Sequence, residues 1–522
     1  MKIAFIILHY LALKDTIECA ESIISNINSS NHQIDVVIVD NGSPDSSYDA
    51  IKDKFSQTQS VHVMRNESNL GFAKGNNVGY KYAKYELKAD FIILLNNDTI
   101  VSQNDFVDVL VNKYFEKKYY VLGPDIVAAD GYHQNPGNKQ SWNLKELSIY
   151  RLKKRILLFL SYLHLDNLVT STFGKTKNVY RDETLIGDIE NIILHGACLI
   201  FSPLYVNRFN GLYDETFLYM EEDILKLYAD FYGFLMMYSS DIRIFHKEDA
   251  ATNMVPLNSK EKTRLKYKRL IESSKKYSKL KRTMLIKKKI VGSIEYVAGK
   301  IKSGGAKYII DFDMPITYLI GIAFQRGIML IRGKIRKIGI KQIGKMVFIG
   351  KSVTLKCKTK MNIGNNVTIQ DHVLLDALSK NGIHLEDGAS IGRYSVVRCS
   401  GNYHELGYGF HLGKNSSLAD ECFIGATGGV YIGDNVICGQ RIRFHASNHY
   451  FNRTDINIKE QGIDAKGINI GNNCWIGAGV VFCDGVSIGN GCVVGANTVV
   501  TKCFPDNSII VGVPAKIIGK RL

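Results

Sequence analysis

The last third of the sequence repeats a pattern with a period of six residues. One set of apolar side chains keeps that spacing without a break, and a second set repeats it four places later: Ile470, Ile476, Phe482, Ile488, Val494 and Val500, then Cys474, Val480, Val486, Cys492 and Thr498. Pairs of an aliphatic residue and glycine extend the pattern back to about residue 346. Three hexads close one triangular coil of a β-helix, and stacked coils bury both sets in one core. The repeat therefore predicts a parallel β-helix in which Cys474 and Cys492 stack in adjacent coils.

The hexads lapse between Phe444 and Ile468, where a polar loop with two histidines leaves the predicted coil. The block of about 175 residues around this loop resembles the left-handed β-helix acyltransferases of the hexapeptide-repeat family, down to the terminal SIIVGVPAKIIGK segment. That resemblance implies a homotrimer that binds acetyl-CoA between neighbouring coils. It places Trp475, Lys502 and Lys516 along the path of CoA, with a structural tryptophan in the wall of the coil as the alternative for Trp475.

By the same resemblance, His449 falls on the catalytic histidine of the family. An imidazole titrates near neutral pH and can take a proton from a sugar hydroxyl while that oxygen attacks an acetyl thioester. His445 is the alternative candidate for the catalytic histidine. It follows Phe444, the inward-facing first position of its hexad, so a structural or secondary role is favoured for it.

The first block of the chain has the pattern of an α/β sheet. Strand-like apolar runs at 2–8, 34–39, 61–64 and 91–95 alternate with polar intervals of helix length, such as 15–28. Ligands of such sheets bind beyond the carboxyl ends of the strands, where this chain has Asp40-Asn41, the segment 66–77 and Asn96-Asn97-Asp98. The carboxylate of Asp98 could hold Mg²⁺ or Mn²⁺ together with a diphosphate. Helix capping is the structural alternative for an acid at this point.

Three segments, VVIVDNGSPDSS, NLGFAKGNN and LLNNDT, together resemble family 2 glycosyltransferases of the GT-A fold, particularly the bacterial rhamnosyltransferase-like group. The resemblance covers roughly the first 280 residues. It implies that Asp40 binds the nucleoside base and that Asp98 is the metal-binding end of a DxD-type motif, in which Asn96 replaces the first acid. The site for the donor nucleotide sugar would be lined by Asn41, Asn69, Gly71, Lys74 and Asn97.

The segment HGACLIFSPLYVNRFNGLYDETFLYMEED resembles the acceptor half of the same enzymes, whose acidic pair supplies the general base. Such a carboxylate takes a proton from the acceptor hydroxyl as the oxygen attacks opposite the leaving diphosphate, which gives inversion. Glu222 is favoured over Asp223 and Glu221, and an acidic first turn of a helix is the structural alternative. In the resembling family, a histidine at the position of His246 can complete the metal site, and a surface or capping histidine is the structural alternative.

The formal charge of +16 is concentrated in the middle of the chain. Residues 255–345 hold 24 basic and 5 acidic side chains, whereas residues 1–254 hold 25 and 32, and residues 346–522 hold 17 and 13. The segment 260–289 has a partly amphipathic helical pattern, and 315–332 suggests a second helix. Basic amphipathic helices lie on anionic membrane surfaces, whereas no nucleic-acid recognition motif accompanies this charge. We therefore expect a membrane or lipid-phosphate partner and no nucleic acid, with a solvated helical face as the alternative.

These patterns predict three parts: a GT-A (Rossmann-like) α/β domain at 1–258, a basic helical connector at 259–340 and a left-handed parallel β-helix at 341–522. The N-terminus resembles a first strand rather than an export signal, and the ten scattered cysteines suggest reduced core residues. We expect a bifunctional enzyme of capsule or O-antigen synthesis on the cytoplasmic face of the bacterial inner membrane, acting on a glycan or lipid-linked acceptor. The alternatives are a non-catalytic trimerising β-helix, or a β-helix that acetylates a nucleotide (amino) sugar.

Overall fold

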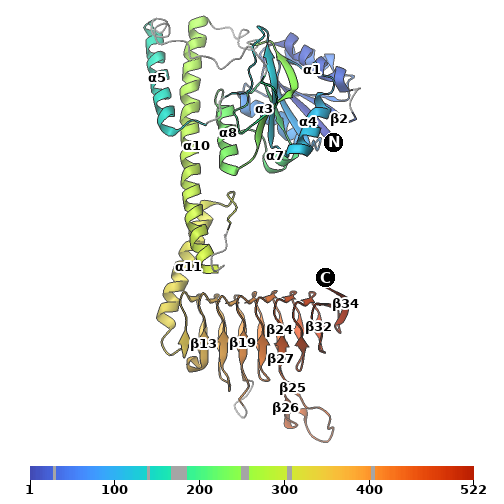
Figure 1. Ribbon diagram of the computed structural model, residues 1–522, viewed down its shortest axis with the longest axis vertical. Coiled ribbons are helices and arrows are strands. Elements are labelled where there is room, and N and C mark those ends of the chain that lie inside the picture. The colour runs from blue at the N-terminus through green and yellow to red at the C-terminus, as the bar shows by residue number, and fades with distance from the viewer. Residues whose placement is uncertain are drawn as a thin grey trace. The chain divides into compact units, whose positions relative to one another are not determined.

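The computed structural model describes residues 1–27, 31–137, 141–165, 185–248, 258–302, 309–400 and 406–521. The chain divides into two compact units, Met1–Ile286 and Lys287–Leu522 (Figure 1). The long helix α10 (Ser259–Lys302) runs across the boundary between them. The fold class predicted from the sequence is confirmed: an α/β domain, a helical middle and a stack of parallel strands. The boundaries at 258 and 340 stay a prediction.

The first unit is built on a nine-stranded sheet of order β3-β2-β1-β4-β8-β6-β9-β5, with β7 paired to β9. Its strands are β1 (Lys2–His9), β2 (Gln33–Asp40), β3 (Val61–Arg65), β4 (Phe91–Asn96), β5 (Thr99–Ile100), β6 (Val121–Ala128), β7 (Asp188–Glu190), β8 (Cys198–Phe201) and β9 (Met236–His246). Strands β1 to β4 are parallel to one another, and β8 pairs antiparallel with β4 and β6. The carboxyl ends of β1, β2 and β4 therefore share one edge of the sheet.

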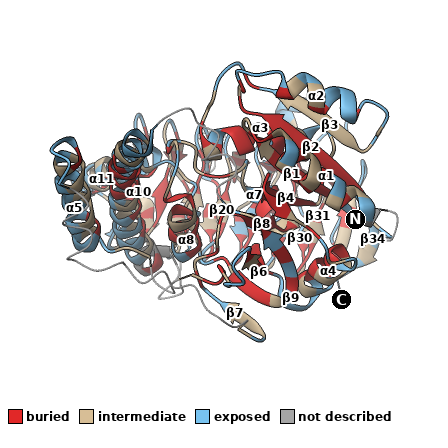
Figure 2. Cartoon of the chain, turned by 90° about the horizontal axis from the view of Figure 1, so that it is seen from above, coloured by how far each residue is buried: buried red, intermediate tan, exposed pale blue. Residues whose placement is uncertain are grey.

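Helices cover both faces of this sheet. They are α1 (Leu13–Ile27), α2 (Ser47–Lys54), α3 (Phe72–Tyr85), α4 (Phe106–Lys117), α7 (Pro203–Arg208) and α8 (Glu221–Tyr232). Along β1, Ile3, Phe5 and Ile7 belong to the core on one face, while Ala4 and Ile6 belong to the core on the other. Strands buried on both faces read as continuous apolar runs, which explains why the sequence shows no alternation here. Figure 2 shows the central strands as buried.

Two further helices, α5 (Leu144–Tyr162) and α10, pack beside α8. Helix α5 begins with a capping box, in which Asn143 accepts from the backbone of Glu146 and Glu146 accepts from the backbone of Asn143. Its Leu147 shares a small apolar core with Ile224 of α8 and Tyr277 of α10. Among the residues described, no helix is both long and apolar enough to cross a bilayer.

In the second unit, helix α11 (Ile316–Arg336) packs on β11 in the first coil of the β-helix. The guanidinium of Arg326 lies 5.0 Å from the centre of the Phe348 ring and donates to the hydroxyl of Thr368. Gly333 allows a close approach, because a Cβ there would lie 2.0 Å from the carbonyl oxygen of Val347. Helix α11 thereby covers strand edges that would otherwise be open to pairing.

The β-helix has three faces, each a stack of parallel strands. Face 1 contains β10 (Gln342–Ile343), β13 (Met361–Ile363), β16 (Ile383–Leu385), β19 (Phe410–Leu412), β22 (Val430–Ile432), β27 (Ile468–Ile470) and β30 (Ser487–Ile488). Face 2 contains β11 (Phe348–Ile349), β14 (Thr368–Ile369), β17 (Ser390–Ile391), β20 (Ser417–Leu418), β23 (Ile437–Cys438), β28 (Trp475–Ile476), β31 (Val493–Val494), β33 (Ser508–Val511) and the antiparallel β34 (Lys516–Lys520). Face 3 contains β12 (Thr354–Lys356), β15 (Leu374–Asp376), β18 (Val396–Arg398), β21 (Phe423–Gly425), β24 (Arg443–His445), β29 (Val481–Phe482) and β32 (Val499–Val500).

The hexad prediction is confirmed residue by residue. Both sets of predicted core positions, from Ile470 to Val500 and from Cys474 to Thr498, are at most 2 % exposed. Strand β28 pairs with β31, so Cys474 and Cys492 lie one coil apart in the core, and all ten cysteines are unpaired. The hairpin of β25 (Asn448–His449) and β26 (Ile463–Asp464) projects from the stack (Figure 1).

Truncating an inward-facing ring should destabilise the β-helix strongly. Phe482 is fully buried, and its ring stacks at 4.8 Å on that of Phe444 in the next coil. We expect Phe482→Ala to lower the free energy of unfolding by about 3–5 kcal/mol, because it removes contacts and leaves a cavity. Its neighbour Val481 is only partly buried, and Val481→Ala is the matched control. Equal losses for the two variants in denaturant titrations would contradict this account of the core.

Candidate functional site

Asp40 ends β2 at the shared strand edge and is fully buried. Its Oδ1 accepts a hydrogen bond from the backbone of Ser43 at 3.1 Å, and Nε of Arg65 lies 3.2 Å from Oδ2. The guanidinium of Arg65 also lies 5.0 Å from the centre of the Tyr48 ring. The carboxylate is thus fixed by neighbours from β3 and the loop after β2.

Asn41 and Asn69 tie that strand end to the following loop. The side-chain amide of Asn41 donates to Oδ1 of Asn69 and to the carbonyl of Gly71, and its own oxygen accepts from the backbone of Leu70. Gly71 has φ +83°, and a Cβ there would lie 2.3 Å from the carbonyl oxygen of Phe217, so only glycine fits. The hydrogen bonds of Asn41 and Asn69 therefore fix the conformation of this loop. Lys74 is exposed on the first turn of α3.

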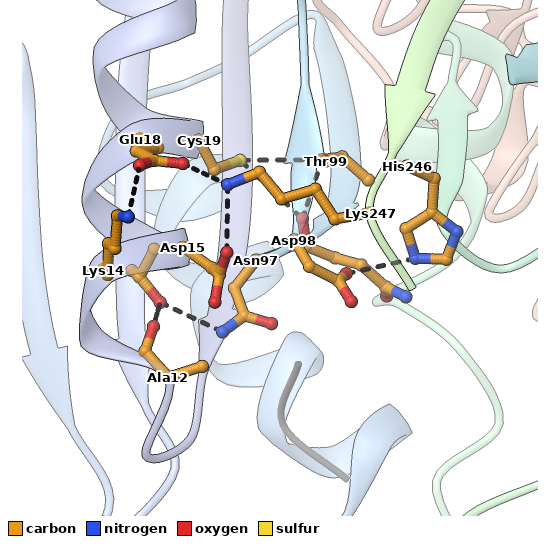
Figure 3. A network of polar contacts seen from close by, with 12 residues as sticks. Ala12, Lys14, Asp15, Glu18, Cys19, Asn97, Asp98, Thr99, His246 and Lys247 are labelled. Atoms are coloured by element: carbon orange, nitrogen blue, oxygen red, sulfur yellow. Dashed lines mark hydrogen bonds and ion pairs between the residues drawn. The ribbon is translucent and has the colours of Figure 1, made fainter. Parts of the chain in front are cut away.

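Asp98 lies two residues after β4, and its side chain meets that of His246, the last residue of β9 (Figure 3). Oδ1 of Asp98 lies 3.1 Å from Nε2 of His246, whose Nδ1 lies 2.7 Å from Oε1 of Gln134. Asn97 points the other way and donates to the hydroxyl of Thr16. The structure therefore brings together the two residues that the sequence analysis assigned to a metal.

The Asp98–His246 pair fits a divalent cation in its spacing. Two ligand atoms at right angles around an octahedral ion lie about 3 Å apart when each is about 2.1 Å from the metal. In the described part of the chain, no group of three or more His, Cys, Asp or Glu side chains could hold a metal ion. A cation held by this pair would need further ligands, which phosphate oxygens of a bound diphosphate could supply.

Lys247 fixes the end of β9 next to His246. Its ammonium group bridges Oδ1 of Asp15, at 3.0 Å, and the carboxylate of Glu18, both on α1 (Figure 3). The backbone N–H of Lys247 donates to the carbonyl of Asp98 at 2.9 Å. This clamp joins α1, β9 and the segment after β4, and it holds His246 facing Asp98.

The three acids at the start of α8 lie in different surroundings. Burial raises the pKa of Glu222, an effect that the backbone N–H groups of Glu222 and Gly196 partly offset. Burial and the charge of Glu222 raise the pKa of Glu221 to about 7. The same two causes raise the pKa of Asp223 to about 7, with the Trp142 side chain acting against them. Glu222 thus faces Gly196, whereas Asp223 faces Trp142, which precedes α5.

His195 and Gly196 connect the acidic helix to the Asp98–His246 pair. The rings of His195 and His246 lie 5.9 Å apart, and Nδ1 of His195 accepts from the backbone of Ala197. Burial and the nearby His246 lower the pKa of His195 to about 4, so its ring is neutral at physiological pH. A Cβ on Gly196 would lie 2.4 Å from Oε1 of Glu222. The predicted base and the predicted metal ligands therefore flank one short segment before β8.

In the β-helix, the two histidines of the predicted loop have different positions. His449 is exposed on β25, where it pairs with Ile463 of β26 in the projecting hairpin. His445 is also exposed, at the end of β24, with its ring 5.7 Å from that of Phe423. Phe444 beside it points into the core, as the hexad phase predicts.

The residues assigned to CoA are all exposed and lie on more than one face. Trp475 is 59 % exposed on face 2, where the order β28-β31-β33-β34 separates it from Lys516 at the start of β34. Lys502 follows β32 of face 3, with its ammonium group 5.7 Å from the centre of the Phe504 ring. The three side chains do not form one cluster in this chain, so their CoA role stays a prediction.

Sequence reasoning missed Gln134, His195 and Lys247. Gln134 and Lys247 belong to no quoted motif, and the sheet order brings all three to Asp98 and His246. Two sequence signals could have marked them: His195 opens the segment HGACLIF, and Lys247 directly follows His246.

Comparison with protein families agrees with this geometry. Residues 4–176 match the model of glycosyl transferase family 2, and residues 467–502 match the bacterial transferase hexapeptide model, which describes six repeats. The first match contains Asp40, Asn69 and Asp98, and the second contains the unbroken hexads.

Relatives match one part of the chain at a time. A probable acetyltransferase of Mycobacterium tuberculosis is 30 % identical over 34 % of this chain and 50 % of its own length. The galactoside O-acetyltransferase of Escherichia coli is 34 % identical over 22 % of this chain and 56 % of its own length. Glycosyltransferase GlyG of Streptococcus pneumoniae is 27 % identical over 27 % of this chain and 46 % of its own length. The chain thus spans about half the length of the curated relatives it matches.

Among solved structures, the N-acyltransferase AntD from Bacillus cereus, in complex with dTDP and 3-hydroxybutyryl-CoA, is 22 % identical. The match covers 37 % of this chain and 88 % of that one, with a TM-score of 0.25. Together the family matches identify a glycosyl transferase family 2 domain at the N-terminus of this chain and a bacterial transferase hexapeptide repeat at its C-terminus.

Proposed function

We propose that the chain is a bifunctional enzyme: it transfers a sugar from a nucleotide sugar to a glycan or lipid-linked acceptor, and an acetyl group from acetyl-CoA to a sugar hydroxyl. The observation that carries the first half is the meeting of Asp98, His246 and Glu222 around residues 195–196. The match to glycosyl transferase family 2 gives that edge of the sheet its reaction class.

In sugar transfer, Asp40 would hold the nucleoside and the loop organised by Asn41 and Asn69 would shape the donor pocket. Asp98 and His246 would hold Mg²⁺ or Mn²⁺, which neutralises charge on the leaving diphosphate. Glu222 would accept the proton of the acceptor hydroxyl, and its raised pKa matches this task better than that of an ordinary carboxylate. Attack opposite the diphosphate inverts the anomeric centre. Rhamnose as the transferred sugar rests on the sequence resemblance.

The contact between Gly196 and Glu222 makes Gly196→Ala a sharp test of the base. The added methyl would fall 2.4 Å from Oε1 of Glu222 and displace the carboxylate. We expect kcat of sugar transfer to fall about 10- to 100-fold with the donor Kd unchanged, because small displacements of a reacting group are costly. Gly292→Ala is the control, since a methyl there meets nothing within 4 Å. An unchanged kcat in Gly196→Ala would count against Glu222.

For acyl transfer, the exposed His449 on its projecting hairpin is the observation that carries the proposal. Its imidazole would deprotonate the acceptor hydroxyl while acetyl-CoA lies along Trp475, Lys502 and Lys516. The similarity to a galactoside O-acetyltransferase supports oxygen rather than nitrogen as the acceptor atom. We further propose a homotrimer, which would assemble the CoA residues that one chain leaves apart.

The basic middle segment supports a location on the cytoplasmic face of the bacterial inner membrane. Exposed lysines along α10, including Lys268, Lys275 and Lys279, would attract anionic lipids. A glycan intermediate of capsule or O-antigen synthesis would be the shared substrate, because a tether raises the concentration of one product near the second site.

Mass spectrometry of the lipid-linked glycan tests the proposal. Cells would carry the intact chain, Asp98→Ala or His449→Ala. We expect Asp98→Ala to remove a sugar and His449→Ala to remove only an acetyl group. An unchanged glycan in His449→Ala would favour a trimerising scaffold. An acetylated free nucleotide (amino) sugar that disappears in that variant would place acetylation before transfer.

A further inference from the structure

A groove with a cavity volume of about 660 Å³ runs along the second unit at the amino-terminal ends of the face 1 strands. Its lining includes the ladder side chains His384, His411 and Tyr431 and the lysines Lys341, Lys380 and Lys466. None of these residues belongs to the sites described above. A cavity of this volume is large enough for a short oligosaccharide.

The ladder arises from the register of face 1. His384 pairs with His411, His411 with Tyr431, and Tyr431 with Asn469, each as the outward-facing centre of its strand. The rings of His411 and Tyr431 stack at 4.5 Å with 9° between their planes, and His384 lies 6.3 Å further along. Rungs of a sheet are about 4.8 Å apart, so this ladder extends about 14 Å from His384 to Asn469.

Glycines form part of the floor beside the ladder. A glycine with positive φ stands directly before the strand in four successive coils: Gly382, Gly409, Gly429 and Gly467. A Cβ at Gly382 would lie 2.0 Å from the carbonyl oxygen of Lys360, so no larger residue fits there. A ligand can approach Tyr431, which is 47 % exposed, across this strip of glycine backbone.

The charge of the groove is positive. Among the described residues that line it, three are lysines and none is acidic. Lys466 is paired with Asp464 at 3.0 Å and the ammonium of Lys380 lies 4.4 Å from the centre of the Tyr408 ring. Burial lowers the pKa of His411, and the nearby His384 lowers it further, whereas Glu386 and Asp434 raise it. Because the net shift is downward, the His411 ring is uncharged at neutral pH. Flat rings beside ammonium groups suit a sugar ring that carries negative charge.

The groove ends at the base of the hairpin that carries His449. The backbone N–H of Gly428 in its lining donates to the carbonyl of Ala446, three residues before His449. At the other end of the hairpin, β26 is followed by Lys466 and Gly467, which also line the groove. The same backbone therefore builds the groove wall and anchors the hairpin.

We propose that this groove binds the acyl acceptor and that the acceptor is an anionic saccharide, stacked on Tyr431 and paired with Lys341 and Lys380. The proposal rests on the acyl-transfer half of the proposed function and names its substrate class. The negative charge can come from an acidic glycan or from the diphosphate of a nucleotide sugar.

Binding to the full chain without acyl-CoA tests this proposal. Isothermal titration would compare trigalacturonic acid, UDP-glucose and neutral maltotriose against the wild type, Lys341→Gln/Lys380→Gln and Tyr431→Ala. We expect the lysine pair variant to lose about tenfold in affinity for an anionic probe at low salt and much less at 1 M salt, where the Debye length is about 3 Å. Tyr431→Phe and the exposed-lysine variant Lys351→Gln are the matched controls.

Each outcome decides a point. A loss confined to trigalacturonic acid assigns an acidic glycan, and a loss confined to UDP-glucose assigns a nucleotide sugar. Equal losses for maltotriose, or no loss for any probe, overturn the proposal. Competition by CoA, or a changed oligomeric state in the groove variants, would instead make the groove a donor site or a subunit interface. His449→Ala should keep the binding, so failed catalysis and failed recognition are distinguishable.

Discussion

Glu222→Gln is expected to reduce the rate of sugar transfer by about 10²- to 10⁴-fold, the range that a general base contributes. Glutamine keeps the shape of the side chain and its contact with Gly196, but it cannot accept a proton from the acceptor hydroxyl. Nucleotide release in the presence of acceptor measures kcat, and donor binding should be unchanged. Unchanged donor binding shows that the first unit is folded, and acyl transfer by the β-helix should also be unchanged.

The pH profile gives the same assignment a second readout. The base works when it is ionised, so activity should fall as pH falls through its folded pKa, which burial raises above the ordinary value of 4.5. Asp223→Asn and Glu221→Gln are matched controls that should retain most of the activity. If Asp223→Asn abolished transfer while Glu222→Gln retained it, the base would be the acid beside Trp142 instead.

Much of the fold could be predicted from the sequence, because both units have a strong local periodicity. Hexads from Ile470 to Val500 mark inward positions one by one, and burial of β1 on both faces leaves an unbroken apolar run. The acids and amides at strand ends were predictable for a related reason, since parallel strands place their carboxyl ends at one edge. Asp98 and His246 are 148 residues apart in the sequence, and the metal role predicted for both implies that their side chains lie close together.

The rest depends on contacts that no local pattern records. The contact between Gly196 and Glu222 needs the antiparallel insertion of β8 between β4 and β6, a departure from the parallel order. Likewise, the ladder of His384, His411 and Tyr431 can be predicted only when the sequence spacing between successive strands of face 1 is known. That spacing is 18 residues from Ile470 to Ile488 but 38 from Ile432 to Ile470, because corner loops differ in length. Counting hexads therefore places the core but not the outward-facing groove.

His449→Ala is expected to reduce acetyl transfer to a sugar hydroxyl by about 10²- to 10⁴-fold while leaving sugar transfer intact. The side chain is exposed on a hairpin that contributes no residue to the buried core, so its removal should not destabilise the coil. Transfer from radiolabelled acetyl-CoA to the glycan measures the effect, and an unchanged unfolding midpoint confirms that the β-helix is intact.

His445→Ala is the matched control for His449→Ala, because both rings are exposed and only four residues apart, yet His445 ends a coil strand beside buried Phe444. It should retain most of the acetyl transfer. Loss in His445→Ala with activity retained in His449→Ala would move the base from the hairpin to the coil. If neither variant changed a measurable wild-type transfer, imidazole catalysis at this hairpin would be wrong, and if the wild type transferred nothing, the β-helix would be a scaffold. The acetyl label therefore separates a catalytic hairpin from a structural one.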